Sequence, residues 1–312
     1  RSTLFPYTTL FRSGRRGRKT AADIAYQPEV SLRAGYRRDH LQWSIADVDN
    51  NPNVLSELDF DHVDSLALAG DLRWSNSSKL FLRGAFDIGW RQNGNVQDSD
   101  YLGNDRTMEF SRSYADVEGG SFFDLSAGLG YRFDIPLRAE ERVLRLIPLA
   151  GYSYHSQEFE ITNGYQALAE YGFKAKPGPI RGLHSWYDAK WYGPWLGLDV
   201  DFSVNRRHAL LLSLEYHWID YEADANWNLR SDLAHPVSFE HDSNGEGYIL
   251  SLAYRYSPNS RWFWTVGASY SSMEADPGFV RTYSADGSDS STQLNRVEWD
   301  SFALTAGLGF YF

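Results

Sequence analysis

Hydrophobic and polar residues alternate with a period of two over most of the chain. The alternation is clearest at the end, where the even-numbered positions from Phe302 to Phe312 are apolar. The positions between them carry small or polar side chains, namely Ser301, Ala303, Thr305, Gly307 and Gly309. Such a pattern is typical of a β-strand with one face in an apolar environment.

Ten segments of this kind follow one another and predict ten antiparallel strands. Their ranges are Glu29–Ala46, Val63–Trp74, Lys79–Trp90, Ser121–Phe133, Val143–Ile161, Tyr187–Phe202, His208–Ala223, Gly245–Arg255, Arg261–Met273 and Trp299–Phe312. A ten-residue strand tilted by about 40° rises roughly 25 Å, which matches the apolar band of an outer-membrane barrel. The sequence therefore predicts an all-β protein, a transmembrane antiparallel up-and-down β-barrel of about ten strands.

The connections between these segments alternate between short and long. The short ones are rich in turn-forming residues and cover Ser75–Ser78, Asp134–Arg142, Ser203–Arg207 and Ser257–Ser260. The long ones cover Asp47–His62, Arg91–Gly120, Thr162–Trp186, Asp224–Asn244 and Glu274–Glu298. Bacterial barrels have short periplasmic turns and long extracellular loops, so we expect the same sorting here.

Composition supports a barrel wall and excludes a helical membrane protein. Aromatic residues make up 16% of the chain, yet the mean hydropathy is −0.48 and no window holds 18 consecutive apolar residues. In a barrel only every second residue faces lipid, and aromatic girdles lie at both interfaces. The absence of cysteine is compatible with passage through an oxidising periplasm.

Residues 1–20 differ from the rest of the chain. They carry six positive charges and no acid, and the run RSTLFPYTTLFRS resembles translated sequencing-adapter read-through. We expect these residues to be an unstructured, non-native leader that stands in place of a signal peptide. Residues 21–312 should then form a single barrel domain.

The remaining charge is strongly acidic. Removing those six charges from 30 Lys and Arg leaves 24 against 41 Asp and Glu, a net charge of −17. Nucleic acid is therefore excluded as a partner. Acidic extracellular loops would attract cationic peptides or divalent ions, or they would simply keep the loops solvated.

The terminal Phe312 resembles the aromatic insertion signal of outer-membrane barrels. We therefore expect a monomer in the outer membrane of a Gram-negative envelope, in contact with outer-membrane lipid.

Four motifs resemble the omptin family of outer-membrane endopeptidases. They are Val54–Phe60 (VLSELDF), Gly94–Tyr101 (GNVQDSDY), Tyr187–Leu198 with its WYGPWLGL core, and Ala306–Phe312 (AGLGFYF). Their order and spacing extend the resemblance over nearly all of the chain from Glu29 onward. The resemblance implies a protease that cleaves between basic residues, in which an Asp pair and an Asp-His pair activate a water molecule.

On this resemblance, Asp98 and Asp100 match the Asp pair of the family. Two neighbouring carboxylates do not ionise together easily, so one of them can keep a proton near neutral pH. The family's Asp-x-His motif is matched by Asp224 and Asn226, and asparagine cannot accept a proton. Losing a general base lowers a rate by on the order of 100-fold to 10,000-fold.

Two histidines follow in the same long connection. Either His235 or His241 could replace the missing base, or both could be ordinary polar residues. The family's lipopolysaccharide site is matched at Tyr152, but Tyr154 and Ser156 stand where the family has charged residues. We therefore assign the two tyrosines to an aromatic girdle.

Two classes of function remain open. One is a non-catalytic ligand-binding or envelope barrel with an incomplete protease site, and the other is an endopeptidase that uses Asp98, Asp100 and Asp224. A transport pore is less favoured, because ten tilted strands enclose little more than their own side chains. No cofactor or metal is expected. We expect a paired polar network in the lumen, formed with Trp191, Trp195, Glu215, His217 and Arg255.

Overall fold

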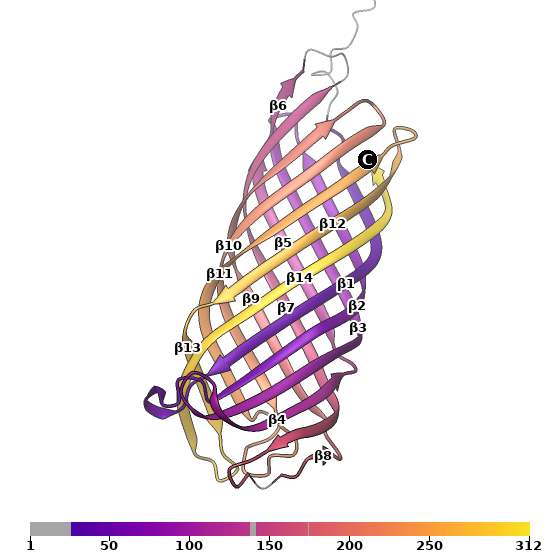
Figure 1. The fold of residues 1–312 in the computed structure, drawn as a ribbon. Coiled ribbons are helices and arrows are strands. Elements are labelled where there is room, and N and C mark those ends of the chain that lie inside the picture. Colours follow the sequence, from indigo (N-terminus) through magenta and orange to yellow (C-terminus); the bar gives the residue numbers. More distant parts are fainter. Residues whose placement is uncertain (1–25, 138–141, 174) are drawn as a thin grey trace, which may run out of the picture.

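The computed structural model describes residues 26–137, 142–173 and 175–312. They form one antiparallel sheet that closes on itself into a tall, tilted barrel (Figure 1). Strand β1 (Glu29–Ile45) pairs along its length with β14 (Asp289–Tyr311) and, on its other side, with β2 (Ser56–Ser75). Pairing of the first strand with the last closes the ring and satisfies the backbone groups of both.

The other strands follow in chain order. They are β3 (Leu80–Gly103), β4 (Thr107–Val117), β5 (Ser121–Tyr131), β6 (Phe133–Pro136), β7 (Val143–Ala169), β8 (Gly178–Pro179), β9 (Ser185–Ser203), β10 (His208–Asn226), β11 (Phe239–Tyr256), β12 (Trp262–Ala275) and β13 (Gly278–Tyr283). A 3-10 turn, η2, covers Val48–Asn50.

Around the ring, the strands pair in the order β1-β2-β3-β4-β7-β9-β10-β11-β12-β14, and β14 pairs with β1. Strands β4 and β5 share one position between β3 and β7, and β13 pairs with β11 and β14 above the end of β12. The wall thus has about ten strand positions, and the predicted all-β barrel is confirmed.

The expected long connections are mostly strand rather than loop. Strand β3 runs on to Gly103, β7 to Ala169, and β11 already begins at Phe239. The prediction ended β3 and β7 too early, because irregularities in strand pairing shift the alternation, and it began β11 too late. One such irregularity lies between Asp61 and Ser65 on β2, where His62 has a φ of 52°.

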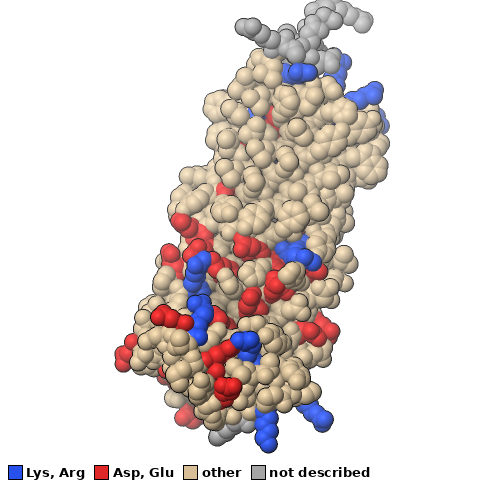
Figure 2. Space-filling view, viewed as in Figure 1, with Lys and Arg blue, Asp and Glu red and all other residues tan. Residues whose placement is uncertain are grey.

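The outer surface of the wall carries an apolar band. Large side chains on this face are exposed, among them Leu66, Leu129, Leu196, Leu214, Leu252 and Leu304. Figure 2 shows this band as a surface almost free of charge, with a few basic side chains at the upper end and most acidic side chains in the lower half of the view. Such a band matches the hydrocarbon core of a bilayer. None of the helices among the described residues has the length and hydropathy to cross a membrane.

Aromatic side chains border the band at its extracellular edge. Tyr36, Tyr192, Tyr216 and Tyr270 each donate a hydrogen bond to a carboxylate, and the partners are Asp64, Glu222, Glu246 and Asp300. Tyr152 is 53% exposed on the same face of β7, and Tyr154 stacks on Tyr192. These tyrosines occupy the positions of an interfacial girdle, with an apolar ring toward the band and a hydroxyl toward water.

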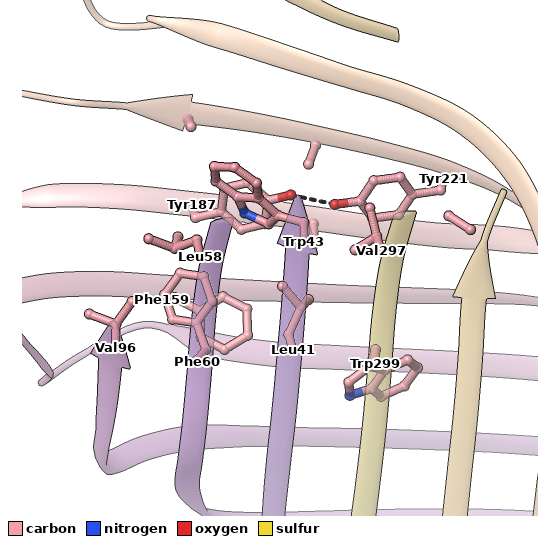
Figure 3. Close-up of a cluster of buried hydrophobic side chains, with 14 of the residues drawn as sticks. Leu41, Trp43, Leu58, Phe60, Val96, Phe159, Tyr187, Tyr221, Val297 and Trp299 are labelled. Atoms are coloured by element: carbon pink, nitrogen blue, oxygen red, sulfur yellow. Dashed lines mark hydrogen bonds between the residues drawn. The ribbon is translucent and has the colours of Figure 1, made fainter. Parts of the chain in front are cut away.

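The extracellular half of the lumen is filled by aromatic and aliphatic side chains, here called the mouth cluster (Figure 3). It is centred on Trp43, Phe60, Phe159, Tyr187 and Trp191, and each of these side chains is at most 5% exposed. The Phe60 and Phe159 rings stack at 4.4 Å between centroids. This dense packing closes the barrel toward the outside.

Below the mouth cluster, the lumen is lined by ion pairs. Arg83 bridges Asp199 at 2.7 Å and Glu215 at 2.6 Å, and Arg255 binds Glu29 through two hydrogen bonds. Most of these charged groups lie in ion pairs, which offset the cost of burying them. The expected network around Glu215, His217 and Arg255 is present, with Trp191 and Trp195 buried beside it. The expected leader, residues 1–20, lies outside the described residues.

Refolding in detergent tests the topology. We expect a β-rich circular dichroism spectrum and an unheated band that migrates differently from the heated one, because a closed barrel resists unfolding by the gel detergent. Limited proteolysis should cut first in the segment between β10 and β11. A stable monomer in detergent-free buffer would contradict this fold assignment.

A buried ion-pair cluster on β1 should dominate stability. The Asp39 carboxylate accepts hydrogen bonds from Arg37 (2.8 Å), Arg91 (2.6 Å) and Trp299 (3.0 Å), and Asp39 is fully buried. Asp39→Asn leaves two buried guanidinium groups undercompensated, and we expect a loss of about 3–5 kcal/mol in urea unfolding. Asp64→Asn, which removes the exposed pair with Arg38, is the control and should cost much less.

Candidate functional site

Asp98 and Asp100 lie together on the inner face of β3, at the extracellular mouth. The register places Asp98 opposite Leu58 of β2 and Asp100 opposite Ser56. Since Leu58 belongs to the mouth cluster, the paired Asp98 and its neighbour two residues along point inward as well. The two carboxyl groups therefore cap the mouth cluster from the extracellular side.

The electrostatics of the pair favour the protonated state. Burial, together with the negative charge of Asp100, raises the pKa of Asp98 well above its usual value. Burial also raises the pKa of Asp100, although hydrogen bonds from Ser56 and Ser111 oppose the shift. The pair thus holds a proton more tightly than two exposed carboxylates would.

A positive charge lies close to this pair. Arg230, in the segment between β10 and β11, lowers the pKa of both Asp98 and Asp100 by electrostatic attraction. Its own guanidinium is held by Asp232 through two hydrogen bonds of 2.9 and 2.7 Å. Sequence reasoning missed Arg230, because nothing in the local pattern shows that this loop folds back over β3.

Asp224 and Asn226 do not face the aspartate pair. Both lie on the outer face of β10, where the Asp224 carboxylate accepts a hydrogen bond from Lys190 of β9 at 3.1 Å. Asp224 and Asn226 are partly exposed, whereas Ala223 and Ala225 between them are buried in the mouth cluster. The expectation that Asp224 joins the aspartates at the mouth is thus not met, because a strand sends successive side chains to opposite faces.

The inward positions of β10 at this height therefore carry methyl groups. Ala223 pairs with His241 and Ala225 with Phe239. In this part of β10 the odd-numbered side chains point into the lumen. An acid or a base could therefore reach the lumen only from an odd-numbered position.

The two loop histidines have different environments. His235 is exposed, and its Nδ1 hydrogen-bonds the Asn226 side chain at 2.7 Å on the outer face. His241 points inward but is only 2% exposed, within the mouth cluster, where its Nδ1 hydrogen-bonds the Tyr187 hydroxyl at 3.0 Å. Burial lowers the pKa of His241 to about 3. This ring is neutral at physiological pH and is a weak base.

Comparison with known proteins places this geometry in context. A family model described as "Pom: Protochlamydia outer membrane protein" matches residues 31–312. Among solved structures, the outer membrane protease OmpT from Escherichia coli superposes with a TM-score of 0.75 over 92% of this chain and 97% of that chain. The identity is 14%, so the likeness shows the fold alone.

More distant barrels add no further argument. The outer membrane protein OprG from Pseudomonas aeruginosa matches with a TM-score of 0.33 and 9% identity, over 92% of this chain and 96% of that chain. No curated protein matches the sequence. The chain belongs to the Protochlamydia outer membrane protein family and is an outer-membrane β-barrel with the architecture of OmpT.

Proposed function

We propose that this protein is a non-catalytic outer-membrane barrel that binds a cationic group at its extracellular mouth. The observation that carries the proposal is the inner face of β10, where Ala223 and Ala225 occupy the positions from which a base would face Asp98 and Asp100. An aspartate pair can bind a cation, whereas the Asp-His half of the arrangement that the omptin resemblance implies has no counterpart on the inner face of β10.

The aspartate pair supplies the attraction. Asp98 and Asp100 are held side by side, and burial disfavours the ionised form of both. The charge of Asp100 adds to this effect at Asp98, and the charge of Glu109 adds to it at Asp100. A positively charged ligand group would relieve this repulsion and would stabilise the ionised form. Arg230 already supplies part of that compensation from within the chain, so the ligand must compete with it or share the pair with it.

An endopeptidase is the alternative function. It would need a base other than the two histidines, since His235 lies on the outer face and His241 is buried with a pKa of about 3. The Asp98 and Asp100 pair and the OmpT-like fold favour this alternative. Fold alone does not establish an activity.

A cleavage assay separates the two functions. Refolded wild type, incubated with a dibasic peptide library, should release no more product than an Asp98→Asn, Asp100→Asn double variant. Asn226→His should be equally inactive, because residue 226 lies on the outer face of β10. Cleavage by wild type that is lost in the double variant would establish the endopeptidase instead.

Binding should strengthen as the pH rises. Because the pKa of Asp98 is raised, the pair gains its negative charge only above the usual titration range of aspartate. The affinity for a fluorescent trilysine amide, measured by anisotropy, should therefore increase between pH 5 and pH 8, and binding should release protons.

Asp98→Asn should weaken this binding by about tenfold, as expected for one charge-assisted hydrogen bond. Asp220→Asn, on the exposed outer face of β10, is the matched control and should bind as wild type does. Equal weakening in both variants would mean that general negative charge attracts the peptide, and not the mouth site.

A further inference from the structure

The periplasmic end of the barrel, opposite the aspartate pair, is rich in cations. Each short turn at this end carries at least one Lys or Arg: Lys79 between β2 and β3, Arg132 and Arg142 on either side of β6, Arg207 between β9 and β10, and Arg261 between β11 and β12. Basic side chains are visible at this end in Figure 2. The charge of this end is thus opposite to that of the acidic extracellular half.

Three of the cations meet at a single carboxylate, that of Asp134 on β6. Its oxygens lie 3.0 Å from the Arg132 Nε, 3.2 Å from the Arg145 Nε and 3.5 Å from the Lys79 Nζ. Contact with one carboxylate places the three cationic groups within reach of a single ligand group. Three positive charges around one negative charge leave a surplus of positive charge, and we call this group of four residues the rim cluster.

The described part of the chain does not neutralise this surplus. The register places Asp201 of β9 opposite Arg145, but the Asp201 carboxylate accepts a hydrogen bond from Arg73 at 2.9 Å. Arg132 is only 8% exposed, and its Nη1 is buried without a hydrogen-bond partner. A buried guanidinium group with an unused donor and too little negative charge around it favours an anionic ligand.

An aromatic ring backs the rim cluster on the side of the lumen. The guanidinium carbons of Arg132 and Arg145 lie 4.9 and 5.7 Å from the centre of the Tyr26 ring. Tyr26 in turn packs edge-on against the buried Phe81, with 5.6 Å between ring centroids. The Lys79 side chain, by contrast, is 42% exposed. The rim cluster is therefore covered from within and accessible through Lys79.

Beside Lys79 the barrel wall has a free edge with an apolar outer face. Among the described strands β6 pairs only with β7, because β3 begins at Leu80, opposite Tyr131 and before the start of β6. On the outer face, Tyr131, Phe133 and Ile135 are 46%, 49% and 39% exposed. A surface for an apolar chain thus adjoins the rim cluster around an edge that no described strand covers.

This combination fits a ligand with an anionic head and an apolar tail. Guanidinium and ammonium groups bind phosphate oxygens through charge-assisted hydrogen bonds, and basic clusters beside a membrane-spanning segment attract anionic lipid headgroups. We propose that Lys79, Arg132 and Arg145 bind the phosphate of an anionic phospholipid of the periplasmic leaflet. Its acyl chains lie along the outer face of β6.

The test uses short-chain phosphatidylglycerol as the probe, added to the barrel refolded in neutral detergent. Phosphatidylcholine of the same chain length is the reference, since it has the same tails and no net charge. Glycerol phosphate at equal concentration supplies an anionic phosphate without tails, so it separates a lipid site from a site for soluble phosphate. Thermal unfolding midpoints and the number of bound lipids in native mass spectrometry are the readouts.

Wild type should unfold at least about 2 °C higher in phosphatidylglycerol than in phosphatidylcholine, because a ligand that binds only the folded state stabilises it. Lys79→Gln, at an exposed position, should fold and should weaken phosphatidylglycerol binding severalfold. The Lys79→Gln, Arg145→Gln double variant should lose the difference between the two lipids. Each variant is compared with itself in both lipids, so a general loss of stability cancels.

Arg261→Gln is the matched control. It removes an exposed cation from the β11–β12 turn, away from β6, and should respond as wild type does. An equal loss of the lipid difference in this control would show that general positive charge, and not the rim cluster, attracts the lipid.

Three further results would overturn the proposal. Equal responses to the two lipids would show binding of the tails alone, and a full response to glycerol phosphate would show a site for soluble phosphate. A response that appears only in a Glu140→Gln, Glu141→Gln variant would show that the chain supplies its own anion, since these two acids follow β6 in the sequence and lie outside the described residues. The rim cluster and the Asp98 and Asp100 pair lie at opposite ends, so either proposal can fail alone.

Discussion

Pairing of β1 with β14 is the interaction on which the rest of the molecule depends. The register runs unbroken from Glu29 with Tyr311 to Ser44 with Arg296. Once the ring is closed, every strand except the short β6 and β8 has two neighbours, and side chains of the wall face either the lumen or the outside. Alternation along the strands then fixes an apolar exterior and a mixed interior at the same time.

The interior of the barrel consists of two layers that are packed in different ways. Toward the outside, the mouth cluster fills the lumen with rings at core density, and the Tyr187 and Tyr221 hydroxyls hydrogen-bond each other within it. Toward the periplasm, charged side chains fill the lumen by pairing across it, from Arg73 to Asp199 and from Arg255 to Glu29. A layer of rings above a layer of ion pairs thus occupies much of the lumen of a ten-stranded ring.

The same layering separates two groups of inward-facing carboxylates. The aspartate pair at the mouth lies above the mouth cluster and faces the exterior, whereas Asp87 lies below it and faces the lumen. Arg230 attracts the pair at the mouth, and Arg33 and Arg37 attract Asp87.

The sequence by itself determined the fold. Period-two alternation, sorted turn lengths and the terminal strand up to Phe312 sufficed for a barrel of about ten strands, because a strand's two faces meet different environments and its residues must reflect both. The same alternation placed Asp98 and Asp100 on one face, and the structure puts both inside. The alternation could not show how far the strands extend. Irregular pairing near His62 and Asn163 shifts the alternation of inward and outward residues in the parts of the strands beyond the membrane.

Only the tertiary structure decided which residues share a site. Asp224 and Asn226 match a family motif in spacing, yet the alternation of β10 turns both outward and leaves Ala223 and Ala225 inside. Arg230 reaches the aspartates through a loop whose path no local pattern encodes. The row of Asp87, Asp124 and His155 joins three strands far apart in sequence, and the missing partner of Asp87 is visible only when all its neighbours are in place. Which side chains are buried and which are ion-paired depends on the closed ring, and the sequence of a single strand does not show it.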